Sequence, residues 1–114
     1  MKSRIIVASE DCVYDIVDDI AMEGYNLLAI EERINSYGEY VIVYEGNDLD
    51  GWDSLEDDDY INEEEKETIR KKFGNVIMDI SLYPYLGEIG EHVMDLYYSG
   101  KLMVNGERCE EEEY

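Results

Sequence analysis

The chain has 114 residues and a formal net charge of −21, because 30 Asp and Glu face only 9 Lys and Arg. Its 45% hydrophobic content is enough for one modest core, which excludes global disorder and predicts a single domain over residues 1–114. Such a negative field repels nucleic acid and anionic membranes and attracts basic surfaces. We therefore expect a folded acidic protein whose partner is a basic protein, with no direct binding to nucleic acid or membrane.

The sequence also bears on location and redox chemistry. It has no apolar run of about 18 residues and no leader-like N-terminal segment, so a cytoplasmic location is expected. Cys12 and Cys109 lie far apart without CxxC or Cys/His spacing, which argues against a disulfide framework and a zinc site.

The N-terminal half of the chain gives the clearest local patterns. A short strand is expected over residues 2–9, followed by a helix over residues 10–23 that Ser9 caps and Gly24 ends. One apolar stripe at helical spacing runs along that helix: Val13, Ile16, Val17, Ile20 and Ala21. Two further strands, over residues 27–34 and 39–46, flank the turn sequence NSYG and predict a β-hairpin.

An acidic loop over residues 46–61 separates this half from the rest. Asn62 with Glu65 resembles a capping box and starts a helix that ends at Gly74. A strand is then predicted over residues 75–83, followed by a helix that has Pro84 near its start and Gly100 past its end. A short final strand with an Asn-Gly turn precedes an acidic tail over residues 107–114.

This order is β-α-β-β-α-β, which predicts a ferredoxin-like α+β sandwich with a C-terminal extension of a helix and a short strand. Such a sheet packs its helices on one face. The other face would then present Tyr40, Ile42 and Tyr44, because alternate residues of a strand share a face. Tyr40 and Tyr44 are thus a possible aromatic interface for a partner or a homodimer, unless the C-terminal extension covers them.

Signals for an enzyme are nearly absent. His92 is the single histidine and lies among carboxylates, which favours a solvated or packed side chain over a catalytic base. Neither GxSxG, HExxH, a P-loop nor GxGxxG occurs. With Gly51 at the sixth position of an EF-hand loop, the first ligand position falls on Gly46. We expect no catalytic residue, no cofactor and no specific metal site.

The carboxylates themselves are the candidate site. Asp11, Asp15 and Asp18 form a row on the helix side opposite the apolar stripe, and Asp19 lies on the adjacent row. No base occurs between residues 10 and 23. Carboxylates in such a row are roughly 5–6 Å apart, a spacing comparable to that of phosphates along a nucleic acid. We therefore predict that the row binds in the Arg- and Lys-lined nucleic-acid groove of a partner protein. The alternative is that the row is only a solvated face that keeps the protein soluble.

The acidic loop supplies a second set of predicted contacts. Its candidate residues are Asp48, Asp50, Asp53, Glu56, Asp57, Asp58 and Asp59. Trp52 is the one tryptophan among them. It either anchors the loop in a pocket of the partner or folds back onto the core.

The small size, strong acidity, abundant Tyr, Asp and Glu, and lack of catalytic motifs resemble the small acidic anti-defence proteins of bacteriophages and mobile elements. These include DNA-mimicking anti-CRISPR and anti-restriction proteins. The resemblance implies a non-enzymatic inhibitor that occludes the DNA or RNA site of a host defence nuclease in the bacterial cytoplasm. The alternative function is an acidic protein-interaction adaptor that uses the exposed sheet tyrosines.

Overall fold

The computed structural model describes residues 3–33 and 38–109. The first half contains β1 (Ser3–Ser9), α1 (Glu10–Glu23), β2 (Asn26–Glu32) and β3 (Glu39–Glu45). The acidic loop follows and contains one turn of 3-10 helix, η1 (Leu55–Asp57). The second half contains α2 (Glu63–Phe73), the 3-10 helix η2 (Ile80–Leu86), α3 (Glu88–Tyr98) and the short strand β4 (Met103–Val104).

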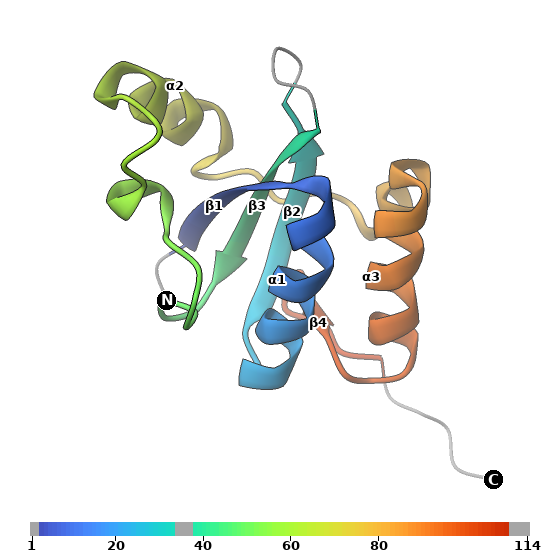
Figure 1. Ribbon diagram of the computed structural model, residues 1–114. Coiled ribbons are helices and arrows are strands. Elements are labelled where there is room, and N and C mark those ends of the chain that lie inside the picture. Colours follow the sequence, from blue (N-terminus) through green and yellow to red (C-terminus); the bar gives the residue numbers. More distant parts are fainter. Residues whose placement is uncertain (1–2, 34–37, 110–114) are drawn as a thin grey trace, which may run out of the picture.

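The strands form one mixed four-stranded sheet in the order β1-β3-β2-β4 (Figure 1). β3 lies in the middle and pairs antiparallel with both β1 and β2, while β4 pairs parallel with β2. The antiparallel pairing of the two predicted hairpin strands and the α+β class are thereby confirmed, whereas residues 35–37 of the predicted turn lie outside the described residues. β1 and the short β4 form the two edges of the sheet.

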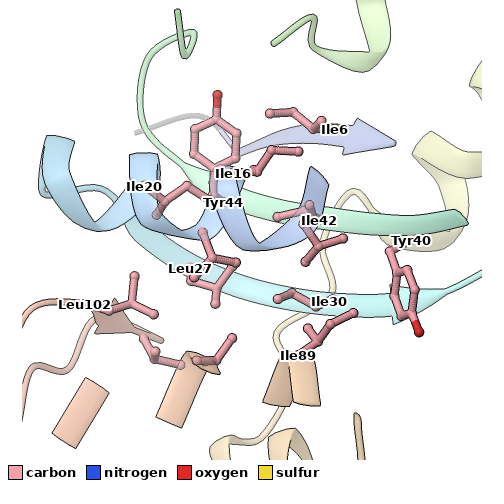
Figure 2. Packing of buried hydrophobic residues seen from close by; sticks show 14 of the residues in the cluster. Ile6, Ile16, Ile20, Leu27, Ile30, Tyr40, Ile42, Tyr44, Ile89 and Leu102 are labelled. Carbon is pink, nitrogen blue, oxygen red and sulfur yellow. The ribbon is translucent and has the colours of Figure 1, made fainter. Parts of the chain in front are cut away.

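Helices cover both faces of this sheet, and the alternation of β3 divides the core between them. Tyr40, Ile42 and Tyr44 point into a cluster beneath α1 and α3 (Figure 2). Val41 and Val43 belong to a second cluster beneath α2. Each cluster contains the β3 side chains from one face of the sheet, because successive residues of a strand point to opposite faces. The expectation that helices pack on one face only is wrong, because α2 lies opposite α1 and α3 (Figure 1).

The ferredoxin-like order is not confirmed. That arrangement places the fourth strand beside the first, but here β4 adds to the β2 edge. The strand predicted over residues 75–83 is absent from these described residues. The segment makes one main-chain hydrogen bond to β2, from Met78 N to Leu28 O at 2.8 Å. The Asp79 carboxylate then accepts from Ser81 N at 2.9 Å and starts η2, because this side-chain bond stabilises a turn in place of a ladder.

Several local predictions are confirmed. Gly24 ends α1 in the left-handed conformation with φ 74°, and the Asn62 side chain accepts from Glu65 N at 2.8 Å. Asn105 (φ 53°) and Gly106 (φ 78°) form the expected turn after β4. Ser9 occupies the N-cap position of α1, but its hydroxyl contacts the Cys12 sulfur at 3.4 Å and makes no capping hydrogen bond. Of the predicted acidic tail, residues 110–114 lie outside the described residues.

Gly90 explains how η2 can lie against α3. A Cβ atom at this position would come within 1.6 Å of the Tyr83 carbonyl oxygen. The absence of a side chain therefore lets the two segments approach closely and buries Tyr83 completely. The glycine that weakens the isolated helix is required by the packing of the folded chain.

Candidate acidic binding surface

The acidic row of α1 is exposed in part, at Asp11 and Asp15, as its spacing predicts. Val13, Ile16, Val17 and Ile20 are buried against the sheet, which turns the opposite side of the helix to solvent. Asp11 and Asp15 are exposed there and form no ion pair or hydrogen bond through their side chains with any described residue. α1 contains six carboxylates and neither Lys nor Arg. Like charges therefore remain uncompensated along this helix.

Asp18 lies on the side of α1 that faces α3. Its Oδ1 is 2.7 Å from Nε2 of His92, and the edge of the His92 ring meets the Tyr14 ring at a centroid distance of 5.4 Å. Burial raises the pKa of Tyr14, and the nearby carboxylates of Glu88 and Glu10 raise it further. His92 is thus a packed and hydrogen-bonded residue that joins the two helices.

The structure adds three carboxylates of α3 that the sequence analysis did not include: Glu88, Glu91 and Asp95. All three are exposed, and α3 lies beside α1 (Figure 1). The sequence does show that acids are concentrated around His92. It does not show which helix lies next to α3, so it does not predict that these acids join those of α1. We call Asp11, Asp15, Asp18, Glu88, Glu91 and Asp95 the acidic helix face.

The first half of the acidic loop lies on the α1 side of the sheet. Leu49 is buried in the core cluster beneath α1, and Asp48 forms an ion pair of 3.0 Å with Arg4 of β1. Trp52 packs against the same cluster and donates from Nε1 to Asp19 Oδ2 at 2.8 Å. Trp52 therefore folds back onto the core, which was one of its two predicted roles. Asp50 and Asp53 are exposed.

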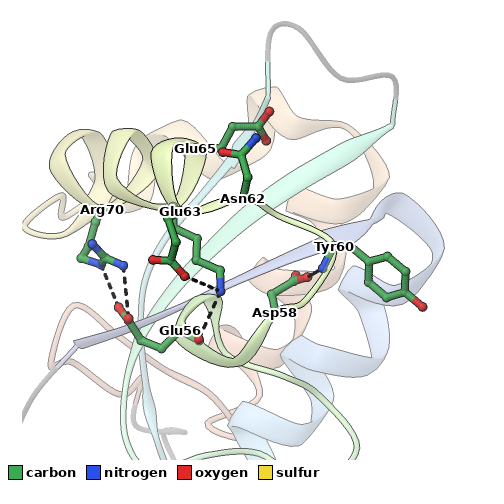
Figure 3. Close-up of polar contacts among 8 residues, drawn as sticks. Glu56, Asp58, Tyr60, Asn62, Glu63, Glu65 and Arg70 are labelled. Atoms are coloured by element: carbon green, nitrogen blue, oxygen red, sulfur yellow. Dashed lines mark hydrogen bonds and ion pairs between the residues drawn. The ribbon is translucent and has the colours of Figure 1, made fainter.

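The second half of the loop crosses to the α2 side, where several acids have partners (Figure 3). Arg70 donates to both carboxylate oxygens of Glu56, at 2.7 and 3.1 Å. Lys66 is buried and donates to the Glu56 carbonyl oxygen at 3.2 Å. Asp58 Oδ1 accepts from Tyr60 N at 2.9 Å. Part of the predicted loop site therefore stabilises the loop itself.

The remaining loop acids differ in their surroundings. Asp57 accepts a long hydrogen bond of 3.4 Å from the Ser54 hydroxyl and is otherwise exposed. Asp59 is exposed beside Tyr60, whose side chain is 100% exposed. Tyr60 is the aromatic residue of the loop that is open to a partner, which was one of the two alternative roles predicted for Trp52. Sequence alone does not distinguish the two, because each is an aromatic residue next to an aspartate in the same acidic loop.

Tyr40 and Tyr44 do not form an exposed aromatic interface in this structure. Their relative exposures are 9% and 0%, because α1 and α3 cover this face of the sheet. The Tyr44 ring stacks on Tyr25 with a centroid distance of 6.1 Å, and its hydroxyl donates to the Asn47 carbonyl oxygen at 2.9 Å. Burial raises the pKa of Tyr44 to about 12.

The charge on the two helical layers is unequal. α1 and α3 carry nine carboxylates, six and three, without Lys or Arg in either helix. α2 carries four Glu against three Lys and one Arg, and two of these pairs are in contact: Lys66 with Glu63 at 3.6 Å and Lys71 with Glu67 at 3.5 Å. The excess negative charge of the folded helices therefore lies on the α1 and α3 side of the sheet.

Within residues 3–33 and 38–109, no three His, Cys, Asp or Glu side chains converge as a metal-binding group. Over the same residues, each helix is too short or too polar to cross a bilayer.

Comparison of the chain with protein-family models, with curated proteins and with solved structures found no significant match.

Proposed function

We propose that the chain is a non-enzymatic inhibitor that binds a basic nucleic-acid-binding protein and occupies its DNA or RNA site. The acidic helix face presents carboxylates in the place of phosphates. The acids are the binding groups, and the buried core beneath α1 and α3 holds them in position. A bacterial defence nuclease, such as a CRISPR effector or a restriction enzyme, is the first class of partner to test.

The uneven distribution of charge is the observation that carries this proposal. A protein that used acids only for solubility would gain from distributing them and from pairing them with bases, as α2 does. α1 instead places Asp15 within helical reach of Asp11, Asp18 and Asp19, and such like-charge neighbours destabilise a helix. A binding role explains why this cost is tolerated.

The geometry suits an Arg- and Lys-lined groove. Neighbouring helices pack about 8–10 Å apart, and carboxylates along one helix repeat roughly every 5–6 Å, so α1 and α3 together give a two-dimensional array. Arginine binds carboxylates with two parallel hydrogen bonds, as it binds phosphates. Release of counterions from both surfaces then contributes to affinity.

The adaptor alternative loses its proposed surface, because Tyr40 and Tyr44 are buried. Tyr60, Tyr85 and Tyr98 are the tyrosines that the described part of the chain exposes most. These three tyrosines lie in the acidic loop, in η2 and in α3. They therefore do not form one aromatic surface like the sheet face that the adaptor alternative requires.

The proposal is tested by affinity capture from nuclease-treated bacterial lysate with a matched pair of variants. In the first variant Asp11→Asn, Asp15→Asn and Glu91→Gln neutralise the acidic helix face. In the control, Glu31→Gln, Glu32→Gln and Glu64→Gln remove the same charge from exposed positions elsewhere. Captured proteins are identified by mass spectrometry, and the affinity of each variant for the recovered protein is then measured.

Under mimicry, the recovered protein binds nucleic acid, elutes with salt and is displaced by DNA or RNA. The first variant then binds at least about tenfold more weakly, which corresponds to about 1.4 kcal/mol, while the control binds almost as the unmodified chain does. Equal loss in both variants indicates general charge attraction and overturns the proposed face. A partner that resists salt and nucleic acid overturns mimicry.

A further inference from the structure

β1 is an edge strand whose main chain pairs on one side only, and η1 of the acidic loop contacts it without a main-chain hydrogen bond. It pairs with β3 through seven residues, from Ser3 opposite Glu45 to Ser9 opposite Glu39. In an antiparallel pair, alternate residues direct their N–H and C=O groups away from the partner strand. Apart from the β1–β3 ladder, no main-chain hydrogen bond from a described residue reaches residues 4–8. This edge can therefore still accept a strand.

A groove of about 640 Å³ runs beside the second half of this edge. One wall is Val7, Ala8 and Ser9 of β1, and the opposite wall includes Tyr60 and Ile61 of the acidic loop. Ile61 is buried in the core cluster beneath α2, so it fixes the loop wall in place. Val7 and Ala8 are only half-buried, which leaves the strand accessible from the groove.

The groove is acidic. Its charged lining residues are Glu39, Asp58, Glu65 and Arg33, and the guanidinium of Arg33 already contacts Glu39 at 3.0 Å and Glu65 at 3.8 Å. More negative than positive charge therefore lines the groove. Tyr60 stands fully exposed at the rim, where its ring can lie against an aliphatic stem or a guanidinium.

We propose that this groove binds an extended basic segment of a partner protein, which adds to β1 as a further strand. Main-chain hydrogen bonds to the free edge supply affinity, and alternate Lys or Arg side chains meet the acids of the groove. A second copy of this chain is a poor occupant, since its own charge of −21 would repel the groove. The site is separate from the acidic helix face and does not depend on the function proposed above.

The test uses a fluorescent peptide of alternating Lys and Val as the probe, at physiological salt. Its twin carries N-methyl groups on the amides along one edge, which preserves charge and side chains but removes main-chain donors. Strand addition predicts that the twin binds at least about tenfold more weakly. It also predicts that the probe slows amide hydrogen exchange in residues 4–8. Equal affinity of the two peptides, or protection confined to α1 and α3, overturns the proposal.

Two matched variants locate the groove. Tyr60→Ala removes a fully exposed ring at the rim and is expected to weaken the probe severalfold. Tyr85→Ala removes an 86% exposed ring from η2 and should leave affinity unchanged. The variant with Asp11→Asn, Asp15→Asn and Glu91→Gln alters residues outside the groove and should weaken probe binding less than Tyr60→Ala does. If the triple variant loses affinity for the probe and Tyr60→Ala does not, the peptide binds the acidic helix face and the groove is not its site.

Discussion

The Trp52 indole donates a hydrogen bond of 2.8 Å to the Asp19 carboxylate, and this contact fastens the acidic loop to α1. The two groups are 33 residues apart in the chain. Because Trp52 also packs against the core cluster beneath α1, the loop and helix acids are held in one arrangement. Trp52 is therefore a structural residue whose polar group is already satisfied.

Trp52→Phe should lower the free energy of unfolding by about 1–3 kcal/mol, because it removes a donor to a charged carboxylate and some apolar contact. Urea unfolding of the single variants Trp52→Phe and Asp19→Asn and of the double variant measures the coupling. The double variant should be less destabilised than the sum of the single effects. Strict additivity would contradict the contact.

Tyr83→Phe should stabilise the fold by about 1 kcal/mol or leave it unchanged, because the buried hydroxyl has no hydrogen-bond partner among the described residues. Tyr44→Phe is the matched control. Its hydroxyl donates to the Asn47 carbonyl, so its removal should cost about 1 kcal/mol. Thermal and urea unfolding at neutral pH compare the two. A loss of stability in Tyr83→Phe equal to that in Tyr44→Phe would refute the assignment.

Stability should fall steeply under alkaline conditions. Burial raises the pKa of Tyr44 from 10.0 to about 12, and it also raises the pKa of Tyr83. Raised folded-state values mean that these groups contribute fully below pH 10, the unfolded value, and that the contribution is lost as the pH rises toward and through the folded values. Melting temperatures from pH 9 upward should show this decline, with a shallower decline in Tyr44→Phe. A flat profile would argue against burial of these phenols.

Asn105 joins three segments at the end of the chain. Its N–H donates to Leu27 O at 2.9 Å, its side chain donates to Met78 O at 2.7 Å, and its φ is 53°. Asn105→Gly keeps the favourable backbone and should cost about 1 kcal/mol. Asn105→Ala also incurs left-handed strain and should cost about 2 kcal/mol. Chemical denaturation gives both values; the reverse ranking would exclude the left-handed turn as a source of stability.

The structure also separates stabilising acids from destabilising ones. Asp15→Asn should raise stability by up to about 1 kcal/mol, because the carboxylate is exposed between like charges. Glu56→Gln should lower stability by less than about 1 kcal/mol, because it weakens the bidentate contact with Arg70. The two variants change net charge equally, so unfolding at low salt isolates the local environment. Equal shifts for both would show that only total charge matters.

The local elements were predictable because their signals lie within a few residues. The stripe of α1, the Asn62 cap and the Asn105–Gly106 turn each follow from residue type and spacing. The order of the sheet was not predictable in this way, because it depends on contacts between distant segments. The apolar pattern over residues 75–83 is typical of a strand. The segment instead turns at Asp79, because the Asp79 carboxylate accepts a hydrogen bond from Ser81 N.

The same limit applies to the candidate site. The sequence predicts that Asp11 and Asp15 are exposed, because they oppose an apolar stripe. It does not reveal that Asp48 pairs with Arg4 or that Glu56 pairs with Arg70, since these partners meet only in the folded chain. Nor does it show that the hairpin tyrosines lie beneath helices, because a central strand covered on both faces has no solvent side.

The unequal charge of the two helical layers makes the molecule an electric dipole. In the field of a basic surface the molecule turns its α1 and α3 side forward before contact, so a larger fraction of collisions begins in one orientation. This alignment works over roughly one Debye length, about 8 Å at physiological salt. Association with a basic surface should therefore slow as salt is added, even where the final contacts are unchanged.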